Sequence, residues 1–283
     1  MSGTWRSLTS DELTGGANQE TAPFGTFAPN YLQRVLIGIG KNTVLKRGLF
    51  RGKYTQIILA LSKGPLDIFF RDCAYRIWGE NNLIEYGLLL NPDYNKADLD
   101  FLLTNASPDA NFIDLGSNIG LYSQPMAKTA PIGKTISIDA NPLMAKRLAF
   151  NANATGLNNL KMVSAAVSDA DGQGSLIIRK DDVAIVAVEE TSGGEIPIRT
   201  LGAILNEQKI ETIYGLKIDI EGHEDKALAP FLMNAPKAQL PKKIVIEHPE
   251  PDSDYPECTK VFAKLSYVLV GRSRNNSFYE LMP

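Results

Sequence analysis

The chain has 283 residues, of which 44% are hydrophobic and 22% are charged. This composition is sufficient for a packed core and is not typical of a disordered chain. The net charge of −3 argues against a globally basic nucleic-acid-binding protein, although it leaves room for a local basic patch.

The expected compartment follows from three features of the sequence. Cys73 and Cys258 are the only cysteines and lie far apart, which favours free thiols in a reducing environment. The polar N-terminus lacks the basic-then-apolar pattern of a signal peptide. No apolar run approaches the length that a membrane span requires. We therefore expect a cytoplasmic protein without a transmembrane segment.

The first 108 residues are predicted to precede the main domain. Residues 1–28 are polar and aperiodic, so we expect a flexible N-terminal tail. Residues 29–108 are expected to form a helical and β-hairpin extension, with two helical faces in 29–61, a hairpin in 65–77 and a helix in 96–105. A basic cluster within it could contact an anionic surface such as a membrane face, although a solvated helix face is the more common outcome. The cluster comprises Lys41, Lys46, Arg47, Arg51 and Lys53.

Strands and helices alternate through the predicted main domain, residues 109–283. This alternation, ending in an antiparallel hairpin, predicts an α/β fold with a mostly parallel seven-stranded sheet. The helices are expected at 121–129, 143–155 and 201–209. The strands are expected at 111–115, 135–139, 160–165, 175–178, 183–188, 196–199, 214–220 and 243–247, and the closing hairpin at 267–271 and 278–282.

The stretch from Asn111 to Ser123, NFIDLGSNIGLYS, reads as a buried strand, a glycine turn and a helix start. Such a unit holds nucleotide-like ligands in α/β proteins. Gly116 would permit a positive φ or a close approach to a ligand, and Gly120 would let the helix pack on the strand. We expect Asn118 to cap that helix, whose free N–H groups would suit a carboxylate or phosphate. The G-x-G-x-x-G pattern of dinucleotide-binding folds is absent.

The next predicted strand ends in Asp139, within the sequence TISIDANP. A carboxylate at the tip of the second strand, roughly 20 residues after a glycine turn, is placed to accept hydrogen bonds from ribose hydroxyls. NAD and S-adenosylmethionine both carry such a ribose. The alternative is that Asp139 caps the helix that begins near Pro142.

Four motifs in order resemble the FkbM-type methyltransferases, which use S-adenosylmethionine: FIDLGSNIGLYS, IDANP, AAVSDADG and LKIDIEGHE. The resemblance extends from about Phe112 to Glu247. It implies a class I methyltransferase (Rossmann-like) core behind an N-terminal α+β extension, and methylation of a hydroxyl on a small metabolite, sugar or glycan. Two positions depart from the family pattern: Ala140 replaces a frequent proline, and Gly202 replaces an aspartate.

The resemblance also implies a site for S-adenosyl-L-methionine at the carboxyl ends of the strands. Asp114 would help to hold the amino group of the cofactor, and Ala166 and Val167 would flank the adenine. The full expected set of cofactor contacts is Asp114, Gly116, Ser117, Asn118, Gly120, Tyr122, Asp139, Ala140, Asn141, Ala166, Val167 and Asp219.

Methyl transfer to a hydroxyl requires alignment of donor and acceptor and removal of a proton. His223 is the first candidate for the base, because an imidazole titrates near neutral pH. Asp219 and Glu247 are the alternatives. A metal would find ligands in Asp219, Glu221, Glu247 and His248, but no spacing demands one, and we expect none.

Two other functions stay open at this point. An NAD-dependent oxidoreductase is disfavoured by the missing dinucleotide pattern. A non-catalytic ligand-binding or scaffold protein is disfavoured by the retention of Asp114, Gly116 and Asp139. The sequence identifies neither the acceptor nor the oligomeric state.

Overall fold

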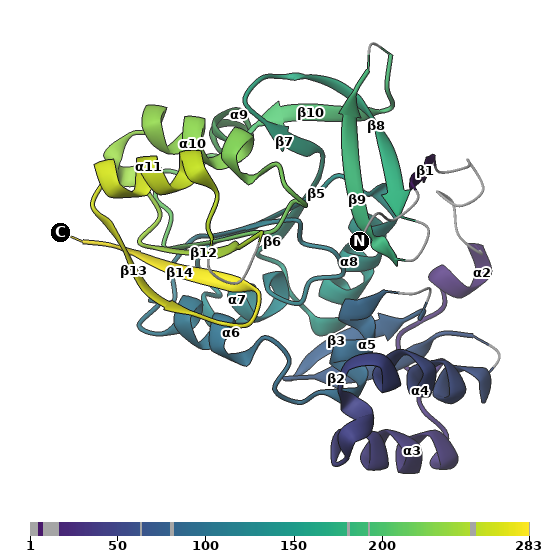
Figure 1. Ribbon diagram of the computed structural model, residues 1–283. Helices are drawn as coiled ribbons and strands as arrows, with labels where there is room; N and C mark the ends of the chain where they lie inside the picture. The colour runs from purple at the N-terminus through teal and green to yellow at the C-terminus, as the bar shows by residue number, and fades with distance from the viewer. Residues whose placement is uncertain are drawn as a thin grey trace.

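The computed structural model describes residues 5–7, 17–62, 64–79, 82–179, 182–191, 193–249 and 253–282. In Figure 1 a central sheet with helices on both faces lies to the left, with a second sheet at the upper right and a group of N-terminal helices below that sheet. None of the described helices is both long and apolar enough to cross a membrane. Cys73 and Cys258 are both buried free thiols.

The central sheet has seven strands in the order β13-β14-β12-β11-β4-β5-β6. Strands β12, β11, β4, β5 and β6 run parallel, and β14 pairs antiparallel with both β12 and β13. The predicted mostly parallel sheet with a C-terminal hairpin is therefore confirmed. The strands are β4 (Phe112–Leu115), β5 (Thr135–Asp139), β6 (Leu160–Ser164), β11 (Gly215–Ile218), β12 (Lys243–Glu247), β13 (Tyr267–Arg272) and β14 (Asn276–Leu281).

Helices cover both faces of this sheet, so its middle strands are buried on both sides. Every residue of β4 and of β11 is buried, which explains why these strands read as nearly continuous apolar runs. One hydrophobic core includes residues of α9 (Leu201–Glu207), α10 (Glu224–Asn234) and α11 (Pro256–Lys264). The other core includes residues of α7 (Ser123–Thr129) and α8 (Pro142–Thr155) together with the N-terminal helices. Helices α10 and α11 and the short η2 (Lys237–Gln239) were not predicted from the sequence.

The N-terminal helices pack directly against the central fold. Residues as early as Ile37 and Ile58 share one hydrophobic core with Phe112, Met126 and Phe278. Residues on both sides of position 108 share this core, so the predicted domain boundary there stays a prediction. The elements are α3 (Tyr31–Lys41), η1 (Val44–Lys46), α4 (Gly48–Ala60), β2 (Leu66–Phe70), β3 (Cys73–Ile77), α5 (Leu83–Leu90) and α6 (Lys96–Leu103).

The segment expected to be a loose tail is tied to the hairpin β2–β3 in its described part. Arg76, which is only 2% exposed, binds Asp67 through Nε and Nη2. Its remaining N–H groups donate to the backbone carbonyls of Gln19, Ala22 and Pro23. Residues 17–20 form the short helix α2 (Ala17–Glu20), and Trp5–Ser7 form β1. These contacts anchor the chain around residues 19–23, because a buried guanidinium requires acceptors for all its donors, and the flexible tail over residues 1–28 stays a prediction.

Strand β1 belongs to a second sheet, in which β8 pairs with β1, β9 and β10, and β10 also pairs with β7. The antiparallel pair predicted around residue 180 is confirmed as β8 (Gly172–Arg179) and β9 (Asp182–Glu190). The sequence did not indicate that these strands leave the central sheet. The short β7 (Ala166–Ser168) runs parallel to β10 (Ile196–Thr200), and together they connect the two sheets.

Candidate active site

The glycine turn after β4 is shaped by contact with the neighbouring strand end. Gly116 has φ +76°, and a Cβ there would lie 1.8 Å from the backbone oxygen of Asp219. Only glycine fits, because any side chain would collide with backbone beyond β11. Gly120 has φ +97°, and a Cβ there would lie 2.3 Å from Leu148 Cδ1. Gly120 therefore makes room for α8, and the expected packing of α7 onto the strand is not its role.

The expected cap of α7 by Asn118 is wrong, whereas a ligand at the start of this helix stays a prediction. Asn118 adopts a left-handed conformation with φ +47° and lies five residues before the helix, whose capping position is held by Tyr122. The N–H groups of Gly116 and Ser117 donate to the carbonyl of Ile138 at 2.9 and 3.1 Å. The Asn118 N–H donates to Asp139 Oδ2 at 2.7 Å. The turn uses these donors to join β4 to β5, so they are already satisfied before any ligand binds.

Asp139 ends β5 as predicted, with one backbone donor on each carboxylate oxygen. Oδ2 accepts from the Asn118 N–H, and Oδ1 accepts from the Asn141 N–H at 2.8 Å. Burial raises the pKa of Asp139 to about 6, against the opposing effect of these two hydrogen bonds. The cap of α8 is Asn141, which accepts from Leu143 N at 3.0 Å, with Pro142 in the first turn. Asp139 is thus not the helix cap, and each oxygen retains a lone pair for another donor.

Asp114 lies in β4 beside a buried lysine in β11. Its Oδ2 accepts a short hydrogen bond from the Ser123 hydroxyl, while its buried Oδ1 has no hydrogen-bond partner among the described residues. Burial raises the pKa of Asp114 to about 6, although Ser123 and Lys217 act in the opposite direction. Lys217 is the residue paired with Asp114 in the parallel register.

Lys217 is the central cation of the site and was missed by the sequence analysis. It is 2% exposed, and its Nζ lies 3.3 Å from Asp219 Oδ2 and 5.1 Å from the centre of the Tyr122 ring. Burial alone would lower the pKa of Lys217, but Asp219 and Asp114 outweigh burial and raise it. The signal was present in the sequence: a single lysine inside the apolar strand LKID must be buried with counter-charges.

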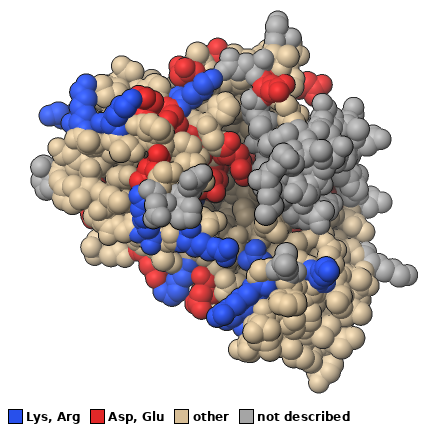
Figure 2. All heavy atoms as spheres, viewed as in Figure 1, with Lys and Arg blue, Asp and Glu red and all other residues tan. Residues whose placement is uncertain are grey.

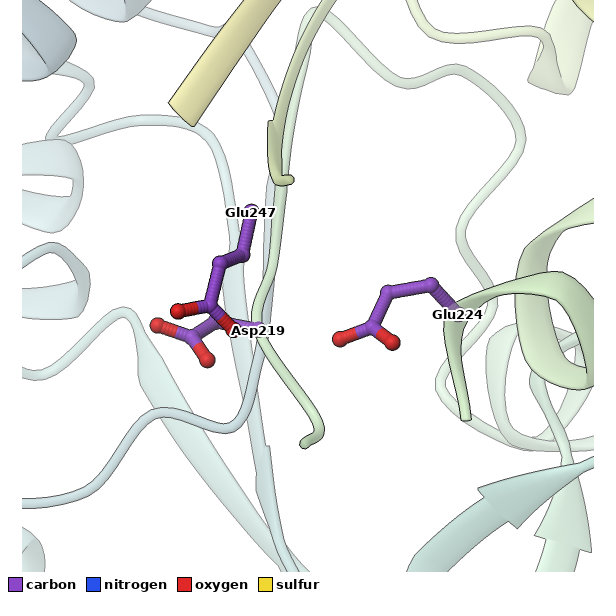
Figure 3. A group of neighbouring side chains, drawn as sticks. All are labelled: Asp219, Glu224 and Glu247. Carbon is purple, nitrogen blue, oxygen red and sulfur yellow. The ribbon is translucent and has the colours of Figure 1, made fainter. Parts of the chain in front are cut away.

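Asp219 and Glu247 bring two carboxyl groups together beyond β11 and β12. Figure 3 shows the two side chains against each other, with Glu224 facing them from the start of α10. Burial raises the pKa of Glu247 well above its usual range, and the adjacent Asp219 raises it further, so the two carboxyl groups favour holding one proton between them at neutral pH. Asp219 is the more accessible of the pair, since 37% of its side chain is exposed.

Ligand atoms of Asp219, Glu224 and Glu247 all lie within 4.8 Å of one another. This set differs from the metal ligands considered from the sequence, since Glu224 replaces Glu221 and His248. Glu224 is fully buried and already accepts from the backbone N–H of Ile220 and Gly222 at 2.7 and 2.9 Å. It therefore fixes the turn between β11 and α10, and our expectation of no metal stays a prediction.

The two histidines occupy different surroundings. His223 holds the capping position of α10, is half-buried, and makes no side-chain hydrogen bond to the helix. His248 is buried after β12, and neither ring nitrogen has a hydrogen-bond partner among the described residues. The carboxyl cluster contains neither histidine. The base role of His223 stays a prediction.

Tyr122 connects the glycine turn to the N-terminal extension and the C-terminal hairpin. Its hydroxyl donates to Asp98 Oδ2 at 2.6 Å and accepts from Asn95 Nδ2 at 2.7 Å. The same Asp98 oxygen accepts from Asn276 Nδ2 in β14 at 2.8 Å. Asn82, before α5, donates to Asn118 Oδ1 at 3.1 Å. The extension therefore lies directly on the glycine turn.

The residues expected to contact the adenine lie next to the end of β5, where Asp139 stands. The Ala165 N–H donates to the carbonyl of Asp139 at 3.1 Å, which places Ala166 and Val167 at the tip of β5. Ala140 is half-buried, and Ser117 and Val167 are buried. At the second departure from the family pattern, Gly202, the helix α9 is still capped, because Thr200 Oγ1 accepts from Ala203 N at 3.2 Å.

A mostly parallel seven-stranded sheet with an antiparallel closing hairpin, a glycine turn after β4 and an acid at the tip of β5 defines a nucleotide-binding class I methyltransferase fold. The family model of the methyltransferase FkbM domain matches residues 114–269, more than half of the chain. The protein belongs to the FkbM methyltransferase family. It is accordingly an S-adenosylmethionine-dependent methyltransferase, as the four motifs suggested.

Solved structures with a similar fold have low sequence identity to this chain. Methyltransferase FkbM from Methylobacillus flagellatus KT is 15% identical, with a TM-score of 0.44 over 70% of this chain and 52% of that one. M. jannaschii TYW2 in complex with AdoMet is 12% identical, with a TM-score of 0.42 over 78% and 88%. M. capricolum TrmK with S-adenosyl-homocysteine is 10% identical, with a TM-score of 0.39 over 65% and 66%. Curated proteins gave no match.

Proposed function

We propose that the protein methylates a hydroxyl oxygen of a small metabolite, sugar or glycan. The observation that carries this proposal is the carboxyl pair of Asp219 and Glu247 at adjacent strand ends (Figure 3). A hydroxyl must lose its proton as it attacks, and an accessible carboxylate beside a protonated partner is suited to accept it. The position beyond the carboxyl ends of the strands is where ligands bind in such sheets.

The cofactor, when bound, supplies a methyl group on a positively charged sulfur. Asp219 accepts the proton of the acceptor hydroxyl, and Glu247 donates its own proton in a hydrogen bond that orients Asp219. The oxygen that Asp219 deprotonates would be the atom that receives the methyl group when the cofactor is bound. His223 is the alternative proton acceptor.

The residues around the glycine turn fit the cofactor. Asp114 Oδ1 is a buried acceptor without a described partner, which suits the amino group of the cofactor. Asp139 has a free lone pair on each oxygen for the two ribose hydroxyls. We propose that the further contacts come from Gly116, Ser117, Asn118, Gly120, Tyr122, Ala140, Asn141, Ala166, Val167 and Asp219.

The test combines cofactor binding with transfer of a labelled methyl group. Isothermal titration with S-adenosylmethionine, S-adenosylhomocysteine and NAD should give binding of the first two only. A screen of sugars, sugar nucleotides and small phenols should then give a labelled ether. Asp219→Asn should lower the transfer rate by about 10² to 10⁴ while weakening cofactor binding much less. Glu211→Gln, at an exposed carboxylate between α9 and β11, is the matched control.

Two results would contradict this proposal. If His223→Gln abolishes transfer while Asp219→Asn retains it, the proton acceptor is the imidazole. If label appears only in amine acceptors, the hydroxyl substrate class is wrong.

Cofactor affinity should depend on pH through Asp139. The ribose contact needs the ionised carboxylate, whose pKa is about 6 in the free protein. The Kd for S-adenosylmethionine should therefore be constant above about pH 7 and rise, by at most about tenfold per pH unit for this group, as the pH falls through 6. The stability of the cofactor-free protein should depend on pH in the opposite direction. Because the pKa of Asp139 is raised on folding, this group contributes to the free energy of unfolding fully below about pH 4, and the contribution is lost as the pH rises to about 6.

Titrations of Asp139→Asn at a series of pH values check this dependence. The variant should bind more weakly at neutral pH and show a flatter profile, with the remainder due to Asp114. Asp169→Asn, at an exposed acid just beyond β7, should keep the original profile. An unchanged profile in Asp139→Asn would show that this carboxylate does not bind the ribose.

A further inference from the structure

Helix α3 turns an apolar stripe away from the protein. Its buried residues are Gln33, Ile37 and Gly40, and the Gln33 amide donates to the carbonyl of Ile58 in α4 at 2.9 Å. The stripe of Leu32, Val35 and Ile39 follows the i, i+3, i+7 spacing of one helical face, and all three are exposed. An amphipathic helix normally buries this stripe. In α3 the stripe is available to something outside the chain.

The following turn and helix extend this exposed apolar region. In α4, Phe50 and Ile57 are exposed at positions i and i+7, Leu61 follows at i+11, and Lys53 projects from the same side. We call the whole set the α3–α4 apolar surface. Its residues have exposed fractions between 41% and 79% and are Tyr31, Leu32, Val35, Ile39, Val44, Phe50, Ile57 and Leu61.

The charged residues of the segment that forms this surface are all basic. The chain has no Asp or Glu between Glu20 and Asp67, although its overall net charge is −3. The same stretch contains Arg34, Lys41, Lys46, Arg47, Arg51, Lys53 and Lys63. In Figure 2 the lower right of the molecule, where Figure 1 places α3 and α4, is largely uncharged surface edged by Lys and Arg.

We propose that the α3–α4 apolar surface docks on an anionic lipid membrane. Scattered exposed apolar residues are ordinary, but a group of this size on adjacent helices marks an interaction site. Apolar side chains inserted at the level of the headgroups, with cations around them to bind lipid phosphates, are the pattern of interfacial helices. The positive charge complements the negative potential of a leaflet that contains anionic lipids.

Charge and apolar character together disfavour a second copy of the chain or a nucleic acid as the partner of the α3–α4 apolar surface. A symmetric dimer through this surface would place the same cationic stretch opposite itself, and like charges across an interface are costly. Nucleic acid would engage the cations but leave the apolar side chains without contacts. An acidic protein partner matches the charge and is distinguished from lipid by the test.

The test is sedimentation of the full chain with vesicles at physiological ionic strength. We expect at least about tenfold stronger binding to vesicles with about 30% phosphatidylserine than to pure phosphatidylcholine. Val35→Gln with Ile39→Gln should weaken this binding by about tenfold. Lys46→Glu with Lys53→Glu should weaken it by more, since each cation near the surface contributes about fivefold.

Matched controls remove similar groups elsewhere. Ile132→Gln with Met233→Gln changes two exposed apolar residues far from α3, and Lys161→Glu with Lys264→Glu changes two exposed cations. Both control pairs should bind as the parent does, and circular dichroism checks that every variant folds. Titration with S-adenosylmethionine should be unaffected by the α3 and α4 variants, so this result is independent of the proposed acceptor chemistry.

Three outcomes would overturn the proposal. The first is no sedimentation with phosphatidylserine vesicles, and the second is equal binding to neutral vesicles that the charge variants do not alter. The third is a parent protein that dimerises in analytical ultracentrifugation and loses this association on Val35→Gln with Ile39→Gln, which would assign the surface to a second copy.

Discussion

Lys217→Met is expected to reduce the free energy of unfolding by about 3–5 kcal/mol near neutral pH, the usual cost of removing one partner from a buried ion pair. The ammonium of Lys217, which is buried with Asp114, neutralises both Asp114 and the partly exposed Asp219. Without it, both carboxylates face each other with no counter-charge. The loss should appear in urea unfolding at about pH 7.5 and be smaller at about pH 5.5, because uncompensated carboxylates take up protons and the folded state gains stability as the pH falls.

Lys243→Met provides the matched control for this effect. Lys243 is also a buried lysine of the central sheet, but its Nζ donates to the carbonyls of Phe101 and Thr104, both at 2.8 Å. Removing its ammonium should lower the free energy of unfolding by about 1–3 kcal/mol, and this loss should be the same at about pH 7.5 and about pH 5.5. If both variants lose stability in the same pH-independent way, Lys217 is not the counter-charge of the carboxyl cluster.

Gly116→Ala is expected to cost more than about 3 kcal/mol and to abolish cofactor binding. A positive φ alone costs roughly 1–2 kcal/mol for a non-glycine residue. The added Cβ would also lie 1.8 Å from the Asp219 carbonyl, so the ends of β4 and β11 must separate, which adds the cost of overpacking. Asp114 and Asp219 would then move apart, and both are proposed cofactor contacts.

Gly156→Ala separates the two contributions. Gly156 closes α8 with φ +82°, nearly the conformation of Gly116, but a Cβ there would have nothing within 4 Å. It should show only the backbone cost of about 1–2 kcal/mol and unchanged titration with S-adenosylmethionine. Equal losses in the two variants would mean that the close approach to Asp219 has no effect of its own.

The strands of the central sheet were predictable because each is a short, mostly apolar run of sequence followed closely by a polar or glycine residue. The strand ending in Asp139 and the hairpin of β13 and β14 are examples. Helix α10 was not predicted, since it begins directly after the turn at Gly222 and contains Pro230. The second sheet was not predictable either, because local alternation reveals a strand but does not identify its partner.

The chemistry of the site was predictable to a different degree. Asp114 and Asp139 could be found because motif spacing fixes their places at adjacent strand ends. The sequence could not show that the amides of the glycine turn are already hydrogen-bonded, because their acceptors, Ile138 and Asp139, belong to the next strand. Lys217 and Glu224 both lie inside LKIDIEGHE, and for Lys217 the available signal was a charged residue within an apolar strand.

The shared oxygen of Asp98 has a consequence for attempts to exchange the N-terminal segment. That oxygen receives hydrogen bonds from Tyr122, which follows the glycine turn, and from Asn276 near the end of the chain. An N-terminal extension grafted from another methyltransferase would leave both donors without their acceptor unless it carried an equivalent acid at the same point of α6. A chimaera that lacks this carboxylate would therefore leave Tyr122 and Asn276 without their shared acceptor and would disturb the glycine turn after β4.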